Sequence, residues 1–394
     1  MIPEGWREAT AEELCSRISV GIVIKPTQYY VDKEQGVRAF RSANIGEGFV
    51  RDSDWIHISE DGHTKNKKSA LKANDILIVR TGYPGTACLL PPEFEGSNCI
   101  DIIFARPDPE QVVPAYLCTY TNSEYGKKQV LDGSGGLAQQ HFNVGAYKKL
   151  KLPLPPLSEQ KRIAETLQTW DRAIETVEAL IANVRAQKQA LMQQLLPQGT
   201  TPPKKRLPGF SGEWREGRLG SLADISKGEQ KGRASLSGEG PVPVINGGIT
   251  PSGYTDDPNT AANTITISEG GNSCGHVDLI TQPFWCGGHC YALKNLKVDR
   301  GYLFAVLKHR QPEIMSLRVG SGLPNIQKKA LSQFSIPVPA RPEQEKIGKL
   351  AASVDKEIAA LEAQLTALRQ EKAALMQQLL TGKRRVKLPE SEVA

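Results

Sequence analysis

The segment Leu191-Met192-Gln193-Gln194-Leu195-Leu196 occurs a second time, further along the chain, as Leu375-Met376-Gln377-Gln378-Leu379-Leu380. With the same offset and without a gap, the likeness extends upstream to Leu152 and Ile336, and 18 of 45 positions are identical. An internal repeat takes precedence over domain boundaries drawn in any other way. The chain of 394 residues is therefore predicted to hold two copies of one plan.

The repeated segment has the seven-residue hydrophobic period of a coiled-coil helix. In the first copy the two interleaved rows are Ile163, Trp170, Val177, Val184 and Leu191, and Leu167, Ile174, Ile181, Lys188 and Leu195. In the second copy they are Ile347, Val354, Leu361, Leu368 and Leu375, and Ala351, Ile358, Leu365, Lys372 and Leu379. This alternation predicts a long helix whose apolar stripe, the helix seam, needs a partner stripe. A helix of about 57 Å cannot bury its stripe in a small domain, so the two copies are predicted to pack together.

The one polar position of the seam holds Lys188 in the first copy and Lys372 in the second. Such a lysine either fixes the register of the pair or extends its stem out of a loose last heptad, and the sequence leaves both open. Prolines precede both helices, Ser158 is a candidate N-cap, and Gly199 and Gly382 follow the two helix ends.

Two blocks of similar size, residues 1–151 and about 200–335, each precede one of these helices. They share similar starts, Trp6-Arg7-Glu8 and Trp214-Arg215-Glu216, and similar ends, Gly133-Ser134-Gly135 and Gly320-Ser321-Gly322. Between these landmarks the sequences diverge, and short β-type runs stand among Gly, Pro and Asn turns. Each block is therefore predicted to be a mixed domain with a β-rich core, a shared frame that carries a divergent insert.

Composition limits the class of protein more than its function. The net charge is +6, and short basic clusters such as Lys65-Asn66-Lys67-Lys68 and Lys383-Arg384-Arg385 recur along the chain. They suit either a polyanion or solvated loops, so charge alone does not decide. No apolar run has bilayer-spanning length, and seven cysteines lack regular spacing. We therefore expect a cytoplasmic protein with reduced thiols.

The motifs of nucleotide hydrolysis and methyl transfer are missing. No G-x-x-x-x-G-K-[ST] loop occurs, and Pro91-Pro92-Glu93-Phe94 lacks the polar residue that begins an amino-methyltransferase motif. Glu159-Gln160-Lys161 could be interpreted as part of a nuclease site. The second copy reads Glu343-Gln344-Glu345, however, so the lysine is not repeated. Glutamate at such a helix start is explained by the helix dipole. We therefore predict no catalytic residues.

A cluster of soft ligands is the one feature that favours a metal. It comprises Cys274, His276, Cys286, His289 and Cys290. Their spacing matches no common zinc knuckle, and the neighbouring aromatic residues favour a strand whose cysteines face a core. We predict buried thiols and no metal; a zinc hydrolase remains an alternative.

The chain resembles the specificity (S) subunit of Type I restriction-modification systems. The resemblance rests on the Trp-Arg-Glu start, the variable block, the helix entry Leu152–Ile163 and the Leu-Leu helix end, and on the repetition of this plan in the second half. The resemblance covers essentially the full chain. Asn74–Gly82 also resembles a segment of the first target recognition domain, whereas the second helix entry, Ile336–Ile347, departs from the pattern.

This resemblance implies an α+β fold: two β-rich mixed target recognition domains separated by two long antiparallel coiled-coil helices, with a pseudo-twofold internal repeat. The expected parts are 1–155 (first recognition domain), 156–197 (first spacer helix), 198–340 (second recognition domain), 341–382 (second spacer helix) and 383–394 (basic tail). It also implies that each domain reads one half of a split DNA sequence.

The resemblance further implies the partners. The helices dock two adenine methyltransferase (modification) subunits, which use S-adenosylmethionine, and the assembly can recruit endonuclease/translocase subunits that use ATP and Mg²⁺. The chain itself is expected to bind no cofactor and to be no enzyme. A coiled-coil scaffold with two protein-binding adaptor domains is the competing interpretation.

Base readout in the major groove needs Arg or Lys for guanine and Asn or Gln for adenine. Candidates in the first domain are Lys25, Arg38, Arg41, Arg80 and Tyr83, and in the second Lys227, Lys231, Arg233, Asn246, Asn272 and Asn325. The residues expected to clamp phosphates are Lys65, Lys67, Lys68, Lys328 and Lys329.

Overall fold

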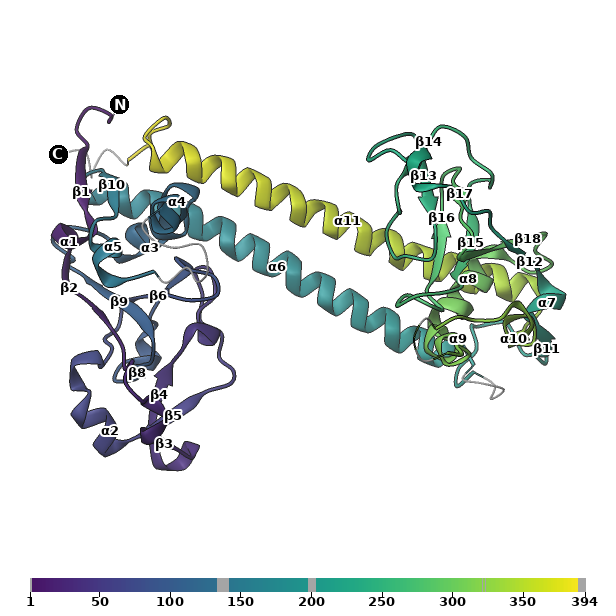
Figure 1. Ribbon diagram of the computed structural model, residues 1–394, viewed down its shortest axis with the longest axis horizontal. Helices are drawn as coiled ribbons and strands as arrows, with labels where there is room; N and C mark the ends of the chain where they lie inside the picture. The colour runs from purple at the N-terminus through teal and green to yellow at the C-terminus, as the bar shows by residue number, and fades with distance from the viewer. Residues whose placement is uncertain (1, 133–141, 198–202, 321, 323, 389–394) are drawn as a thin grey trace. The chain divides into compact units, whose positions relative to one another are not determined.

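The computed structural model describes residues 2–132, 142–197, 203–320, 322 and 324–388. It divides into two compact units, Met1–Thr176 with Leu365–Ala394 (unit 1), and Val177–Gln364 (unit 2). The division cuts both long helices, α6 (Leu157–Leu195) and α11 (Arg341–Leu380). Each unit therefore joins one mixed domain to one half of each helix (Figure 1).

In unit 1 the strands are β1 (Arg7–Thr10), β2 (Cys15–Val20), β3 (Tyr30–Val31), β4 (Gly36–Phe40), β5 (Ile56–Ser59), β6 (Ile76–Val79), β7 (Ala87–Leu89), β8 (Asn98–Cys99), β9 (Ile102–Pro107) and β10 (Lys151–Leu154). The α-helices that precede α6 are α1 (Ala11–Leu14), α2 (Glu60–Lys65), α3 (Pro114–Asn122), α4 (Glu124–Asp132) and α5 (Val144–Lys148).

In unit 2 the strands are β11 (Arg215–Arg218), β12 (Asp224–Lys227), β13 (Val242–Ile245), β14 (Tyr254–Thr255), β15 (Thr264–Ser268), β16 (Val277–Ile280), β17 (Trp285–Cys286), β18 (Cys290–Lys294) and β19 (Ser335–Val338). The helices are α7 (Leu219–Leu222), α8 (Arg300–His309), α9 (Gln311–Ser316) and α10 (Lys328–Ser332).

The two domains share one sheet topology. The main sheet has the order β2-β9-β6-β7 in unit 1 and β12-β18-β15-β16 in unit 2, so that in chain order each sheet reads first, fourth, second, third. A second sheet in each unit contains one parallel pair, β4 with β8 and β13 with β17. The inserts that diverge in sequence therefore keep one frame, because buried strand positions tolerate many apolar residues while exposed positions are free to vary.

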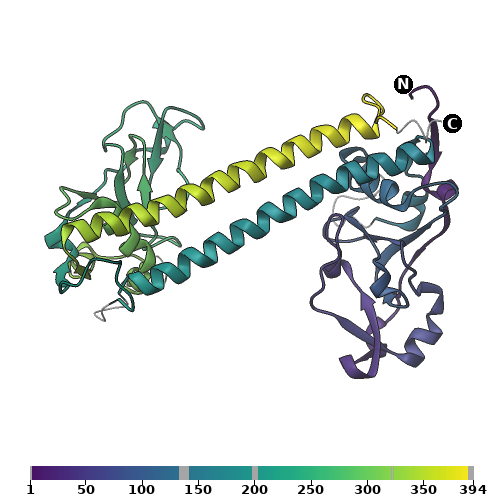
Figure 2. The ribbon, with the colours of Figure 1, turned by 180° about the vertical axis from the view of Figure 1, so that it is seen from behind.

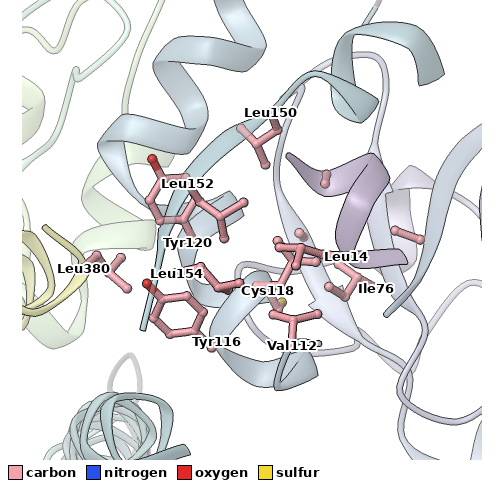
Figure 3. Close-up of a cluster of buried hydrophobic side chains, with 14 of the residues drawn as sticks. Leu14, Ile76, Val112, Tyr116, Cys118, Tyr120, Leu150, Leu152, Leu154 and Leu380 are labelled. Carbon is pink, nitrogen blue, oxygen red and sulfur yellow. The ribbon is translucent and has the colours of Figure 1, made fainter. Parts of the chain in front are cut away.

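Each long helix ends inside the core of a domain. Met192 and Leu196, at the end of α6, belong to the unit 2 core, and Leu379 and Leu380 belong to the unit 1 core. In Figure 3, Leu380 from α11 lies beside side chains of the unit 1 domain, among them Tyr116. The repeated Leu-Leu helix end that defines the sequence repeat is thus an apolar anchor for a domain.

Matching bonds fix the helix starts. Gln160 accepts the backbone N–H of Val113 at 2.8 Å and donates to the Pro155 carbonyl at 2.9 Å. In unit 2 Gln344 makes the same pair of bonds, to the Asp299 N–H at 2.8 Å and the Pro339 carbonyl at 2.8 Å. These bonds hold each helix to the domain that precedes it.

The expectation that Ser158 caps α6 was wrong. Helix α6 begins at Leu157, so Ser158 already lies in the first turn. The chain turns directly from Pro155-Pro156 into the helix, where Gln160 takes up the Pro155 carbonyl. Among the described residues, no helix has both the length and the hydropathy to cross a bilayer.

Candidate nucleic-acid interface

In each domain, one end of the main sheet is formed by the end of one strand and the start of its neighbour: β6 and β9 in unit 1, and β15 and β18 in unit 2. The register pairs Val79 with Ile102 and Ser268 with Cys290. Arg80 thus lies opposite Asp101, with which it forms an ion pair. Glu269 lies opposite His289, whose Nδ1 is 3.4 Å from a carboxylate oxygen. The position directly after β6 therefore holds a cation, Arg80, whereas the equivalent position after β15 holds a carboxylate, Glu269.

Phe142 and Ile326 bond to this same end of the main sheet in their domains. The Phe142 N–H donates to the Arg80 carbonyl at 3.2 Å, and the Ile326 N–H donates to the Glu269 carbonyl at 2.8 Å. Phe142 and Ile326 correspond to each other at the offset of the repeat. Gly133-Ser134-Gly135 and Ser321 lie outside the described residues. The residues that follow β6 and β15 are thus bonded to matching positions of the repeat, Phe142 and Ile326.

Three of the candidate cations in unit 1 are bonded inside the unit. Arg41 donates to the Asp54 carbonyl at 2.7 Å, and Lys65 pairs with Asp61 at 2.7 Å. Arg80 pairs with Asp101 and donates to the Phe142 carbonyl at 3.2 Å. Their donors therefore help to shape the domain, and a DNA contact at these positions would compete with an internal bond.

Other unit 1 candidates leave their polar atoms to solvent. Lys25, Lys67, Lys68 and Tyr83 are exposed, Tyr83 by 84%. Within the described part of the chain, their side chains make no hydrogen bond or ion pair. The half-buried Arg38 is a separate case, since its guanidinium lies over the rings of Trp55 and Phe94.

Unit 2 divides its candidates in the same way. Lys227 pairs with Glu269, and Lys231 lies 4.1 Å above the Trp285 ring and donates to Thr255. Asn246 accepts the His289 N–H at 3.0 Å. The exposed candidates are Arg233, Asn272, Asn325, Lys328 and Lys329.

Sequence reasoning missed Glu269, on which several of these contacts converge. Its carboxylate accepts the Tyr291 hydroxyl at 3.3 Å, in addition to its contacts with Lys227 and His289. A single acid before Gly270-Gly271 gives no local signal, because its partners come from other strands.

The soft-ligand cluster does not assemble. Cys274 belongs to the main core of unit 2, whereas Cys286 and Cys290 belong to a separate buried cluster. Burial raises the pKa of the Cys274 thiol, and the contact with Cys286 together with burial raises that of Cys290. In the described ranges no three His, Cys, Asp or Glu side chains gather as metal ligands. The geometry gives no support to the zinc-hydrolase alternative.

Comparison with known proteins decides the family. The family model described as "Type I restriction modification DNA specificity domain" matches residues 3–186 and 211–370, one match in each half of the chain. The chain belongs to this family. It is a specificity subunit, whose two domains give a type I restriction-modification system its DNA sequence specificity.

Full-length relatives have the same plan. The chain is 29% identical to the MjaX specificity subunit of Methanocaldococcus jannaschii, over 98% of this chain and 95% of that protein. It is 26% identical to the MjaVIII specificity subunit of the same organism, over 82% of each. The crystal structure of an S subunit from M. genitalium has the same fold, with a TM-score of 0.66 at 19% identity and 96% coverage of both chains.

In this specificity subunit every predicted seam residue is buried or half-buried, while most intervening helix residues are exposed. Within each unit the two helix halves run side by side and antiparallel, since higher residue numbers on α11 meet lower numbers on α6 (Figures 1 and 2). Half-burial is what a two-helix seam provides, because each stripe is covered by one neighbour.

The seam lysines form matching ion pairs. Lys188 pairs with Asp355 in unit 2, and Lys372 pairs with Asp171 in unit 1. Each pair is the other shifted by the repeat, as a pseudo-twofold relation requires. Of the two interpretations left open by the sequence, the structure favours register over a loose end: sliding one helix by a heptad would break both pairs.

The glutamates of the repeat have a role that the sequence did not reveal. Glu159 is bonded by Arg385 and by the Trp6 indole N–H, at 2.9 Å. In unit 2 Arg206 makes two bonds of 2.6 Å to Glu343. The glutamates are 6% and 1% exposed, so each is a buried carboxylate that needs its arginine. The available signal was an arginine shortly after each helix, Arg206 after α6 and Arg385 after α11.

We expect Arg385→Ala to destabilise unit 1 by about 2 kcal/mol, because it leaves the buried Glu159 carboxylate without its cation. Chemical denaturation of the full chain measures the loss. Glu159→Gln in the same chain should recover part of it by removing the charge, and Arg384→Ala, a change at an exposed neighbour, is the control. Equal stability of Arg385→Ala and the unmodified chain would contradict the role of this pair.

Proposed function

We propose that each domain of this specificity subunit reads one half of a two-part DNA sequence. The observation that carries the proposal is the duplicated frame with unlike groups at equivalent positions, Arg80 opposite Asp101 in one domain and Glu269 opposite His289 in the other. Two copies of one frame bind DNA in a similar way, while unlike side chains select different bases. The exposed cations of each unit then serve as contacts to phosphates.

The helix pair is proposed to set the interval between the half-sites and to dock two adenine methyltransferase subunits. Lys188–Asp355 and Lys372–Asp171 hold the register in which such an interval is fixed. The exposed faces of α6 and α11 are available for docking, since the seam uses only one stripe of each helix. The same assembly can recruit endonuclease/translocase subunits.

In this proposal the partner subunits catalyse methyl transfer and DNA cleavage, and the complex acts in the cytoplasm. S-adenosylmethionine binds to the methyltransferase subunits, and ATP with Mg²⁺ to the translocase. The chain supplies specificity and carries no catalytic group of its own, in keeping with the missing phosphate-loop and methyltransferase motifs.

Reconstitution tests this division of labour. The purified chain is expected to transfer no methyl group from S-adenosylmethionine to DNA and to cleave no DNA. Addition of the cognate methyltransferase subunit should produce adenine methylation at one two-part sequence, read by sequencing of methylated sites. Methyl transfer by the chain alone, or methylation without sequence preference in the complex, would contradict the proposal.

A further inference from the structure

Arg38 stands apart from the other candidate readers. It lies on β4, and its guanidinium carbon is 5.1 Å from the centroid of the Trp55 ring and 5.4 Å from that of Phe94. Among the described residues no carboxylate or carbonyl accepts a bond from this guanidinium. Its donors are therefore held in place by aromatic faces and left without an acceptor, whereas Arg41 and Arg80 each donate to an acceptor within the unit.

The rings that hold Arg38 are themselves fixed. Trp55 packs edge-on to Phe40 at 4.8 Å and against Phe94 at 5.4 Å, and its indole N–H donates to Asp52 at 2.6 Å. A guanidinium over such rings loses little further freedom when it binds a planar acceptor. The two parallel N–H donors of the Arg38 guanidinium are therefore preorganised to bind a planar acceptor.

Arg38 borders a concavity of about 650 Å³ on the second sheet of unit 1, whose strand order is β3-β5-β4-β8. The register places Val31, His57 and Arg38 side by side on β3, β5 and β4. Burial, and then the cations of Arg38 and Lys33, lower the pKa of His57, so the imidazole is neutral near pH 7.

The charge mixture in this concavity distinguishes its ligand. Besides Arg38 and Lys33 it is lined by Asp32 and Asp52. Two carboxylates repel a phosphate. The major-groove edge of a G·C pair offers both kinds of partner: guanine N7 and O6 accept from an arginine fork, and the cytosine amino group donates to a carboxylate.

We propose that Arg38 reads a guanine in the half-site of the first domain, with the neighbouring carboxylates facing the paired cytosine. This rests on the proposed function. In unit 2 Lys231 also stands over an aromatic ring, that of Trp285, but it donates to Thr255.

The test uses the chain in complex with its cognate methyltransferase and measures methylation rates on duplexes that carry each single base-pair change of the target. The unmodified complex should discriminate at a G·C pair of the first half-site. Arg38→Ala should reduce that discrimination on the order of 10- to 100-fold and leave the other positions unchanged. Arg38→Lys, which keeps a cation over the rings but lacks the fork, should fall between the two.

Arg17→Ala is the matched control, because Arg17 is also half-buried over an aromatic ring, that of Phe104, and lines no part of this concavity. Thermal melting verifies the fold of each variant, and Arg38→Lys decides the question if Arg38→Ala does not fold. Unchanged preference, a uniform loss of rate, a change at an A·T pair, or a first half-site without G·C would overturn the assignment. Absence of any sequence-specific methylation by the unmodified complex would instead refute the proposed function.

Discussion

Exchange of residues 11–150 for the matching block of another specificity subunit is expected to replace the first half of the recognised sequence and leave the second half intact. The block is bounded by β1 and β10, which pair with each other, so its ends are adjacent and the entry to α6 is undisturbed. Two mismatched base pairs at roughly 1–3 kcal/mol each should lower methylation at the old target on the order of 100-fold or more. Sequencing of methylated sites in cells gives the result.

The reciprocal exchange serves as the control. Residues 219–334 lie between β11 and β19, which pair in the same way, and their replacement should alter only the second half. If either exchange changed both halves of the target, the domains would not read independently.

Insertion of one heptad into each long helix is expected to lengthen the unread interval by up to about 3 bp. A copy of residues 178–184 placed after Val177 and a copy of 362–368 placed after Leu361 continue both stripes without moving the apolar face. Seven residues add about 10.5 Å, and DNA rises about 3.4 Å per base pair. About 3 bp also turn the second half-site by roughly a quarter of a turn, which bending of the DNA must absorb.

A heptad in α6 alone is the control for this ruler. Asp171 and Lys188 have the same separation along α6 as Asp355 and Lys372 have along α11, so one longer helix prevents both seam ion pairs from forming together. That variant should be less stable and poorly active. An active double insertion whose half-sites and interval are unchanged would show that helix length does not set the spacing.

The helices were predictable because their signal is local. A seven-residue period places Ile163 and Leu167 on one stripe whatever the rest of the chain does. The shared sheet topology was not predictable, since strand order depends on which distant segments meet, and the two inserts have little sequence in common. The bonds of Glu159 were missed for the same reason: Arg385 is 226 residues away.

The sequence by itself determined the internal repeat, the two long helices, the mixed domain that precedes each helix and, through these, the family. These features follow from the hydrophobic period and from identities at one constant offset along the chain. Both can be recognised without knowledge of tertiary contacts. Only the tertiary structure decided which of the candidate cations already donate to an acceptor within the chain. Arg38, Arg41 and Arg80 cannot be distinguished by residue type. In the structure Arg41 is bonded to Asp54 and Arg80 to Asp101, whereas the guanidinium of Arg38 lies over aromatic rings. Partners brought together by folding, and not residue type, set the hydrogen-bonding capacity that remains for a ligand.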